Sequence, residues 1–171
     1  VISIPLMVFF ALKFAMPFAA QQLAPKVPQS LLAKLDQQII ETLDDQIFSP
    51  TRANLTLRAN LNNAWVRLPN KENLTLLARH GGRIGANALA LPGGHIVVTD
   101  QLLDALKNEN EILAVLSHES GHVFEHHGLR NIIHSLGTAA VISAIIGDAS
   151  WVAELLLVSA PTLMGQLSYS R

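Results

Sequence analysis

The residues with the clearest chemical potential form one short motif, His118-Glu119-Ser120-Gly121-His122. Residues at positions i and i+4 of a helix project to the same side, so the imidazoles of His118 and His122 can bind one metal ion. Because the chain has no cysteine, a metal has only His and carboxylate ligands, and the imidazole pair favours zinc. Glu119 is close enough to accept a proton from a metal-activated water. The motif therefore indicates hydrolysis.

Chance is a poor explanation of this motif. The chain has 7 His among 171 residues, and such a composition gives only about 0.01 coincidental occurrences of His-Glu-x-x-His. A single His on a helix is more often a hydrogen-bonded structural residue, and Glu119 alone would be an ordinary carboxylate. It is the joint spacing that favours a metal site.

A capped amphipathic helix is expected to carry the motif. Asn108 is a good N-cap residue, and Glu111 lies three positions later, from where its side chain can reach back to the cap. Apolar residues such as Ile112 and Leu116 follow at helical spacing, and the helix is expected to end before Gly128.

The third metal ligand is harder to assign from the residues. The metzincin pattern is excluded, because it needs Gly and His where the chain has Glu125 and Gly128. His126 is one turn further along, but each i+4 step rotates by about 40°, so it is expected near a ligand or at the surface. Glu154 and Asp148 are weak candidates in apolar helical sequence.

The elements around this helix predict an α+β fold. Leu32, Leu35, Ile39 and Leu43 are spaced as one face of an amphipathic helix, and Ser49-Pro50 favours the start of a second helix that lasts until Pro69. Residues 73–79, 84–91 and 95–99 are short segments separated by glycine and proline turns, which predicts a small, mainly antiparallel sheet.

Composition narrows the function classes. Half of the residues are hydrophobic and 15% are charged, which excludes disorder as the main character of the chain. The 12 Lys and Arg against 13 Asp and Glu leave no cationic excess, so nucleic acid is not an expected partner. Residues 1–24 are expected to be a membrane-anchor-like apolar helix, with a buried or surface-lying helix as the alternative. A second apolar region, residues 132–167, fits packed helices or a hairpin dipping into lipid.

Residues 81–130 resemble a known family. The segment NALALPGGHIVVT (residues 87–99), then NEILAVLS (residues 110–117) leading into the His-Glu motif, and finally Arg130, is similar to the zinc metallopeptidases that include the CAAX prenyl endopeptidase and the bacterial HtpX heat-shock protease. Leu89 replaces the Phe often found in that family. The resemblance implies a zincin-like fold with a helix that carries the HExxH motif, and a metalloendopeptidase that hydrolyses protein or peptide substrates.

The resemblance also implies roles for individual residues. His118 and His122 would be ligands of one zinc ion, and Glu119 the general base and later the proton donor. The strand formed by Asn87, Ala88, Leu89, Ala90 and Leu91 would pair with an extended substrate, although it could simply complete the sheet. A family motif with a zinc-binding Glu would follow Arg171. Residues 25–171 are therefore expected to be a metallopeptidase domain that stops before its third ligand, and such a fragment would bind zinc weakly. His95, His126, His134 and Tyr169 are the open choices for an oxyanion stabiliser.

Membrane association is also expected from the resemblance, at a bacterial inner membrane with the catalytic domain outside the cytoplasm. The oligomeric state is left open. The alternative function is a non-catalytic, membrane-linked binding or chaperone module that keeps a zincin-like shape. Intact Glu119 argues against this alternative, because a degenerate site has no need of a carboxylate at that position.

Overall fold

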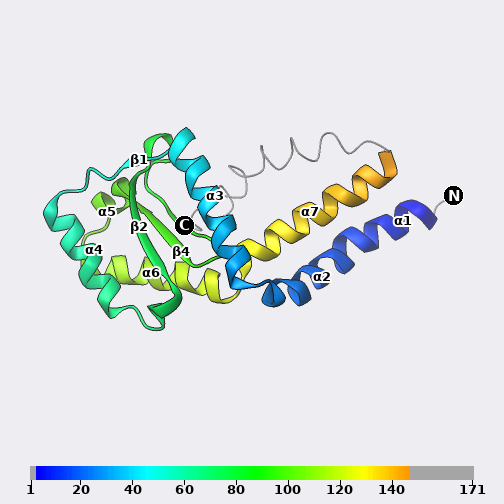
Figure 1. Ribbon diagram of the computed structural model, residues 1–171, viewed down its shortest axis with the longest axis horizontal. Helices are drawn as coiled ribbons and strands as arrows, with labels where there is room; N and C mark the ends of the chain where they lie inside the picture. Colours follow the sequence, from blue (N-terminus) through cyan, green and yellow to red (C-terminus); the bar gives the residue numbers. More distant parts are fainter. Residues whose placement is uncertain (1–2, 147–171) are drawn as a thin grey trace. The chain divides into compact units, whose positions relative to one another are not determined.

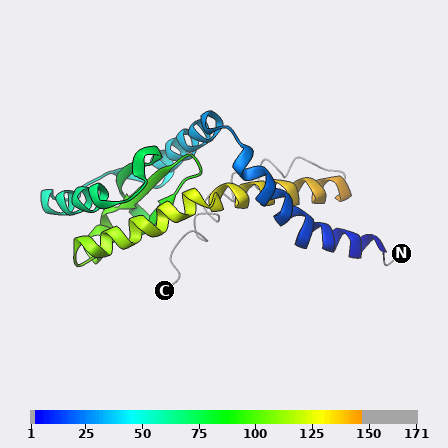
Figure 2. The ribbon, with the colours of Figure 1, turned by 90° about the horizontal axis from the view of Figure 1, so that it is seen from below.

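The computed structural model of the chain describes residues 3–146, which form two compact units. One unit contains residues 3–27 together with residues 126–146, and the other contains residues 28–125. Both are seen in the ribbon of Figure 1 and, from below, in Figure 2.

The first unit is helical. Its N-terminal segment contains α1 (Ser3–Phe10), the π-helical turn η1 (Ala11–Ala15), α2 (Met16–Leu23) and the short 3-10 turn η2 (Ala24–Lys26). Helix α7 (His127–Ile146) packs against α2. A Cβ at Gly137 of α7 would lie 2.5 Å from the sulfur of Met16, so the missing side chain allows this close approach.

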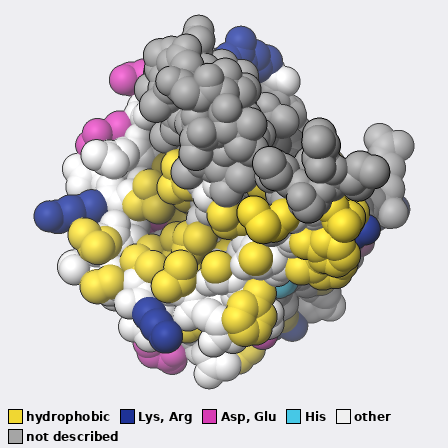
Figure 3. Space-filling model, turned by 90° about the vertical axis from the view of Figure 1, so that its right-hand side faces the viewer, with side chains coloured by type: hydrophobic (Ala, Val, Ile, Leu, Met, Phe, Trp, Pro, Cys, Tyr) yellow, Lys and Arg dark blue, Asp and Glu magenta, His cyan; other side chains and the backbone are white. Residues whose placement is uncertain are grey.

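Large apolar side chains are exposed on this N-terminal segment, and hydrophobic atoms gather on the face of the molecule in Figure 3. Phe9, Phe10, Phe14 and Phe18 are each more than half exposed. Lys13 Nζ lies 5.3 Å from the ring centroid of Phe9, within the range of a cation–π contact. Within residues 3–146, no helix combines the length and the apolar character needed to cross a membrane.

The second unit has the expected α+β composition. Its helices are α3 (Gln29–Gln46), α4 (Leu55–Arg67), α5 (Asp100–Ala105) and α6 (Glu109–Phe124). Its strands are β1 (Ser49–Pro50), β2 (Thr75–His80), β3 (Ala88–Ala90) and β4 (His95–Thr99). Short 3-10 turns, η3 (Lys71–Asn73) and η4 (Gly82–Ile84), precede β2 and β3.

The sheet of the second unit is mixed, with the strand order β1-β2-β4-β3. The pairs β1–β2 and β3–β4 are antiparallel as expected, but the central pair β2–β4 is parallel, with Thr75 opposite His95 and Arg79 opposite Thr99. The reason is the connection between them: the chain leaves β2, passes through β3 as one arm of a hairpin with β4, and thereby returns in the direction of β2.

Helices cover both faces of this sheet, as Figure 2 shows for α3 on one side and α6 on the other. On the α6 side, the core joins Leu61 and Ala64 of α4 and Ile112 and Leu116 of α6 with alternate residues of the strands, such as Ile96. On the α3 side, Leu32 and Leu43 are buried. The alternation along β4 thus gives each helical layer its own apolar partners.

Two sequence predictions fail locally. Ser49-Pro50 does not start a helix; it forms β1 and pairs with Arg79 and His80 of β2. Helix α4 begins six residues after Ser49, at Leu55, because Asn54 is its N-cap and accepts a hydrogen bond from the N–H of Leu57. The strand expected over residues 84–91 is only three residues long, since η4 occupies its start.

Candidate active site

The helix that carries the motif begins where the sequence predicts. Asn108 is the N-cap of α6, and its Oδ1 accepts hydrogen bonds from the N–H groups of Asn110 and Glu111. The carboxylate of Glu111 reaches back and accepts from the N–H of Lys107 and from the Asn108 side chain. The helix ends at Phe124, and His126 has a positive φ of 54°, so α6 and α7 are separate helices.

The two histidines of the motif face each other on the surface of α6. Their Nε2 atoms lie 3.0 Å apart, and the rings are nearly perpendicular, with centroids 4.7 Å apart. Two nitrogen ligands of a tetrahedral zinc ion, each at about 2.05 Å, are about 3.4 Å from each other. The pair formed by His118 and His122 therefore needs to open by only a few tenths of an ångström to fit zinc.

Glu119, unlike the exposed His118, is buried on the helix that packs against β3 and β4. The residue is 5% exposed, and burial raises the pKa of its carboxyl group to about 7, while a hydrogen bond from the backbone N–H of Ala90 lowers the pKa in part. Among the described residues, its Oε2 atom has no hydrogen-bond partner. A buried carboxylate oxygen without a partner is unusual in a folded protein, and it is available to a water or a substrate.

Strand β3 lies at one edge of the sheet and next to Glu119. Because Leu91 donates its N–H to His95 of β4, the alternation of an antiparallel pair turns the backbone groups of Ala88 and Ala90 away from β4. Strand β3 packs against α6, the helix that carries Glu119. Residues 87–91 are all buried, backbone included, so the pairing of this segment with a substrate stays a prediction.

Asn87 anchors the start of this strand. Its N–H donates to the hydroxyl oxygen of Thr99, and its carbonyl accepts from the Thr99 hydroxyl and from the Thr99 N–H. Its side-chain Oδ1 accepts from the N–H of Ala88. Asn87 thus closes the hairpin at the end away from the β3–β4 turn.

A family model identifies the chain. The model of peptidase family M48 matches residues 54–171, more than two thirds of the sequence. The chain belongs to peptidase family M48. No curated protein and no solved structure gave a significant match.

Membership of the M48 family indicates a peptidase. Within residues 3–146, no group of three or more His, Asp or Glu side chains is arranged to hold a metal ion. The weak ligand candidates Glu154 and Asp148, the candidate oxyanion stabiliser Tyr169 and the chain end at Arg171 lie outside the described residues. His134 belongs to α7.

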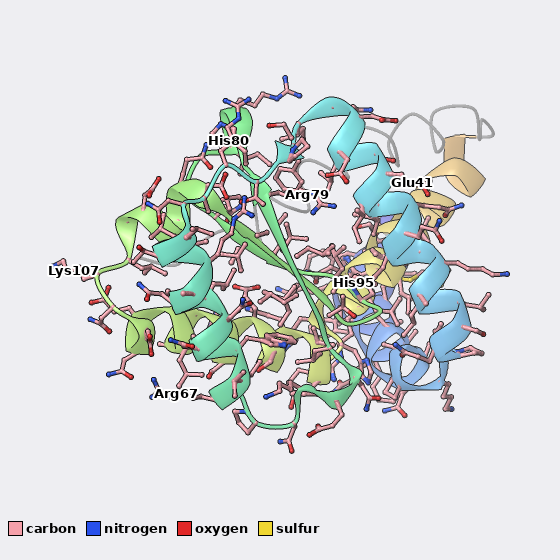
Figure 4. All side chains as sticks on the ribbon, turned by 60° about the vertical axis from the view of Figure 1, so that its left-hand side comes forward. Glu41, Arg67, Arg79, His80, His95 and Lys107 are labelled. Atoms are coloured by element: carbon pink, nitrogen blue, oxygen red, sulfur yellow. The ribbon has the colours of Figure 1, made fainter. Side chains whose placement is uncertain are left out.

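His95, the other open choice for an oxyanion stabiliser, has a partner of its own. Its Nδ1 lies 2.8 Å from Oδ2 of Asp36 on α3, and its position at the start of β4 beside that helix is labelled in Figure 4. Asp36 belongs to no motif and was not predicted as a site residue. The sequence did hold one signal for its burial. Asp36 lies at helical spacing from Leu32 and Leu43, and all three residues are buried along one stripe of α3.

Proposed function

We propose that the protein is a zinc-dependent metalloendopeptidase that hydrolyses peptide bonds within protein or peptide substrates. The observation that carries the proposal is the spacing of the His118 and His122 Nε2 atoms, 3.0 Å apart on the helix that also carries Glu119. Membership of the M48 family supports the same reaction class.

His118 and His122 would hold the ion through Nε2, and a third ligand is not assigned. When bound, zinc supplies Lewis acidity that activates a water molecule and polarises the carbonyl group of the scissile bond. The buried carboxylate of Glu119 suits proton transfer, because a pKa of about 7 in the metal-free chain matches neutral pH.

Glu119 would move one proton in each direction. Its carboxylate accepts a proton from the attacking water as the new carbon–oxygen bond forms, and it gives this proton to the amide nitrogen as the carbon–nitrogen bond breaks. The products are a carboxylate and an amine. Strand β3 is the segment that would pair with the substrate backbone, and backbone pairing places little demand on the substrate's side chains.

The test compares cleavage of casein by the complete protein and by its Glu119→Gln variant. Removing the base is expected to slow cleavage by about 100-fold to 10,000-fold, with the fold retained. Glu72→Gln is the matched control, since Glu72 is an exposed carboxylate in η3. Equal rates for wild type and Glu119→Gln, or no cleavage by either, would favour the non-catalytic binding module instead.

We also propose that the N-terminal segment contacts a membrane surface. Its four exposed Phe side chains, with Lys13 among them, are typical of a helix that lies at a lipid interface. Sedimentation with phosphatidylglycerol vesicles tests this, and Phe10→Ser with Phe14→Ser should weaken binding. Location at a bacterial inner membrane, with the catalytic part outside the cytoplasm, stays a prediction.

A further inference from the structure

Helix α3 contains a completely buried carboxylate that is not part of the His-Glu motif. Asp36 is 0% exposed, and its three hydrogen bonds all go to the turn between β3 and β4 and to the residue that follows it. Oδ1 accepts from the N–H of Gly93 at 2.7 Å, and Oδ2 accepts from the N–H of His95 at 3.2 Å and from Nδ1 of His95 at 2.8 Å.

A second side chain of α3 contacts the same turn. Nε2 of Gln29 donates to the carbonyl oxygen of Gly93 at 2.7 Å. The backbone of the turn is packed closely enough on α3 that a Cβ at Gly93 would lie 2.6 Å from the carbonyl oxygen of Leu32. The turn is therefore held by both its N–H and its C=O groups, directly against the helix.

By holding the β3–β4 turn, α3 also fixes the position of strand β3. Only four residues, Leu91 to Gly94, separate β3 from β4, and they are closed by hydrogen bonds from Leu91 N to His95 O and from Gly94 N to Leu91 O. A short hairpin of this kind transmits the position of its turn to both strands. At β3 the consequence reaches the candidate active site, because β3 packs against α6, the helix that carries Glu119.

We propose that Asp36 is a positioning residue for peptide hydrolysis: by holding the β3–β4 turn, it fixes edge strand β3 at the distance from Glu119 that an extended substrate requires. The inference rests on the proposed function. It also extends the functional unit of the protein, because Asp36 and Gln29 precede residue 54, where the match to the M48 family model begins.

Position 36 requires a carboxylate because the turn and His95 present three donors to it. Asn at position 36 keeps one acceptor oxygen but brings an NH2 group toward either the Gly93 N–H or the His95 N–H, so at least one buried donor loses its acceptor. Asp36→Asn therefore changes the hydrogen bonds to the turn with almost no change in side-chain volume.

The chain supplies a closely matched control. Asp100 is also a buried carboxylate, it accepts hydrogen bonds from the Thr51 hydroxyl and the Arg52 N–H, and it lies 3.5 Å from Nδ1 of His80. Like Asp36, it joins a distant segment to the sheet beside a histidine. It does so at the other end of β2, as the labels of His80 and His95 in Figure 4 show.

The experiment measures kcat and KM for an unstructured peptide substrate with the complete protein and its Asp36→Asn and Asp100→Asn variants, each corrected for the folded fraction and for bound zinc. Misplacing a substrate-binding strand is expected to raise KM or lower kcat/KM by about tenfold in Asp36→Asn. Asp100→Asn should change kcat/KM by less than about twofold. Zinc content per folded chain should be unchanged in both variants.

Hydrogen exchange provides a readout that is independent of catalysis. In Asp36→Asn, the amides of residues 88–95 should exchange faster, while those of α6 keep their protection; in Asp100→Asn, residues 88–95 should be unaffected. If Asp36→Asn does not fold, Gln29→Ala decides the matter, because Gln29 is exposed at the start of α3 and its loss is expected to raise KM by about two- to threefold.

Two results would overturn the positioning role in an active enzyme. One is a folded Asp36→Asn variant, or Gln29→Ala where Asp36→Asn fails to fold, with the kinetics and exchange rates of wild type. The other is an equal loss of kcat/KM in Asp36→Asn and Asp100→Asn. A wild-type protein without peptidase activity would instead refute the proposed function, so the two failures are distinguishable.

Discussion

The backbone N–H of Ala90 lies close enough to the carboxyl group of Glu119 to lower its pKa, and strand β3 packs against α6, the helix of the His-Glu motif. This contact joins two segments that lie 29 positions apart in the chain. Substrate pairing and proton transfer would therefore share one rigid corner of the second unit. Four predictions follow from this corner and from the elements that build it.

Zinc binding should depend on both imidazoles of the facing pair. Replacing either His118 or His122 with Ala is expected to weaken zinc affinity by more than about 100-fold, because an ion loses a direct ligand. Zinc per chain of the complete protein, measured by elemental analysis after dialysis, checks this. His127→Ala is the control, and a variant of His118 or His122 that keeps a full zinc complement would contradict the assignment of the ligands.

Gly93→Ala should destabilise the second unit strongly. The added Cβ would lie 2.6 Å from the Leu32 carbonyl oxygen and 2.8 Å from the carboxyl group of Asp36, and neither the helix backbone nor a completely buried side chain can move freely. The expected loss in the free energy of unfolding is about 2–4 kcal/mol. Urea denaturation measures it; a loss below about 0.5 kcal/mol would mean that the turn does not rest on α3.

Gly121→Ala should instead stabilise the protein. Gly121 lies inside α6, and a Cβ there meets no atom within 4 Å outside the helix's own backbone. Ala is the better helix former, so the free energy of unfolding is expected to rise by about 0.5–1 kcal/mol. The same denaturation experiment compares it with Gly93→Ala, and a destabilised Gly121→Ala variant would show that the space beside the motif is occupied.

Loss of the N-cap should loosen the start of the motif helix. Asn108→Ala removes the acceptor of two backbone N–H groups, those of Asn110 and Glu111, and is expected to cost about 1 kcal/mol in the free energy of unfolding. Hydrogen exchange should increase first in residues 109–112. Lys107→Ala, which keeps the cap residue, should be neutral, and an equal effect of both variants would argue against capping as the cause.

Local signals account for what the sequence predicts well. The bounds of α6 follow from Asn108 and the apolar stripe, and β4 coincides with the expected residues 95–99, because caps, turns and periodicity are properties of neighbouring residues. The spacing of His118 and His122 on one helical face is local in the same sense.

Contacts between distant segments account for the failures. Ser49-Pro50 has the composition of a helix start, yet it forms β1 because β2, 29 or more positions later, offers an edge to pair with. The parallel pairing of β2 with β4 and the hydrogen bonds of Asp36 are likewise set by partners far along the chain, which no local pattern encodes. The family resemblance covers residues 81–130 and therefore says nothing of α3.

The brevity of both edge strands has a consequence for the behaviour of concentrated protein. A long, flat edge is a template on which identical chains can stack into fibres. Here β1 has two residues and β3 has three, so neither edge offers enough consecutive backbone groups for a neighbouring copy to zip onto it. The short edges thus give identical chains little backbone on which to polymerise.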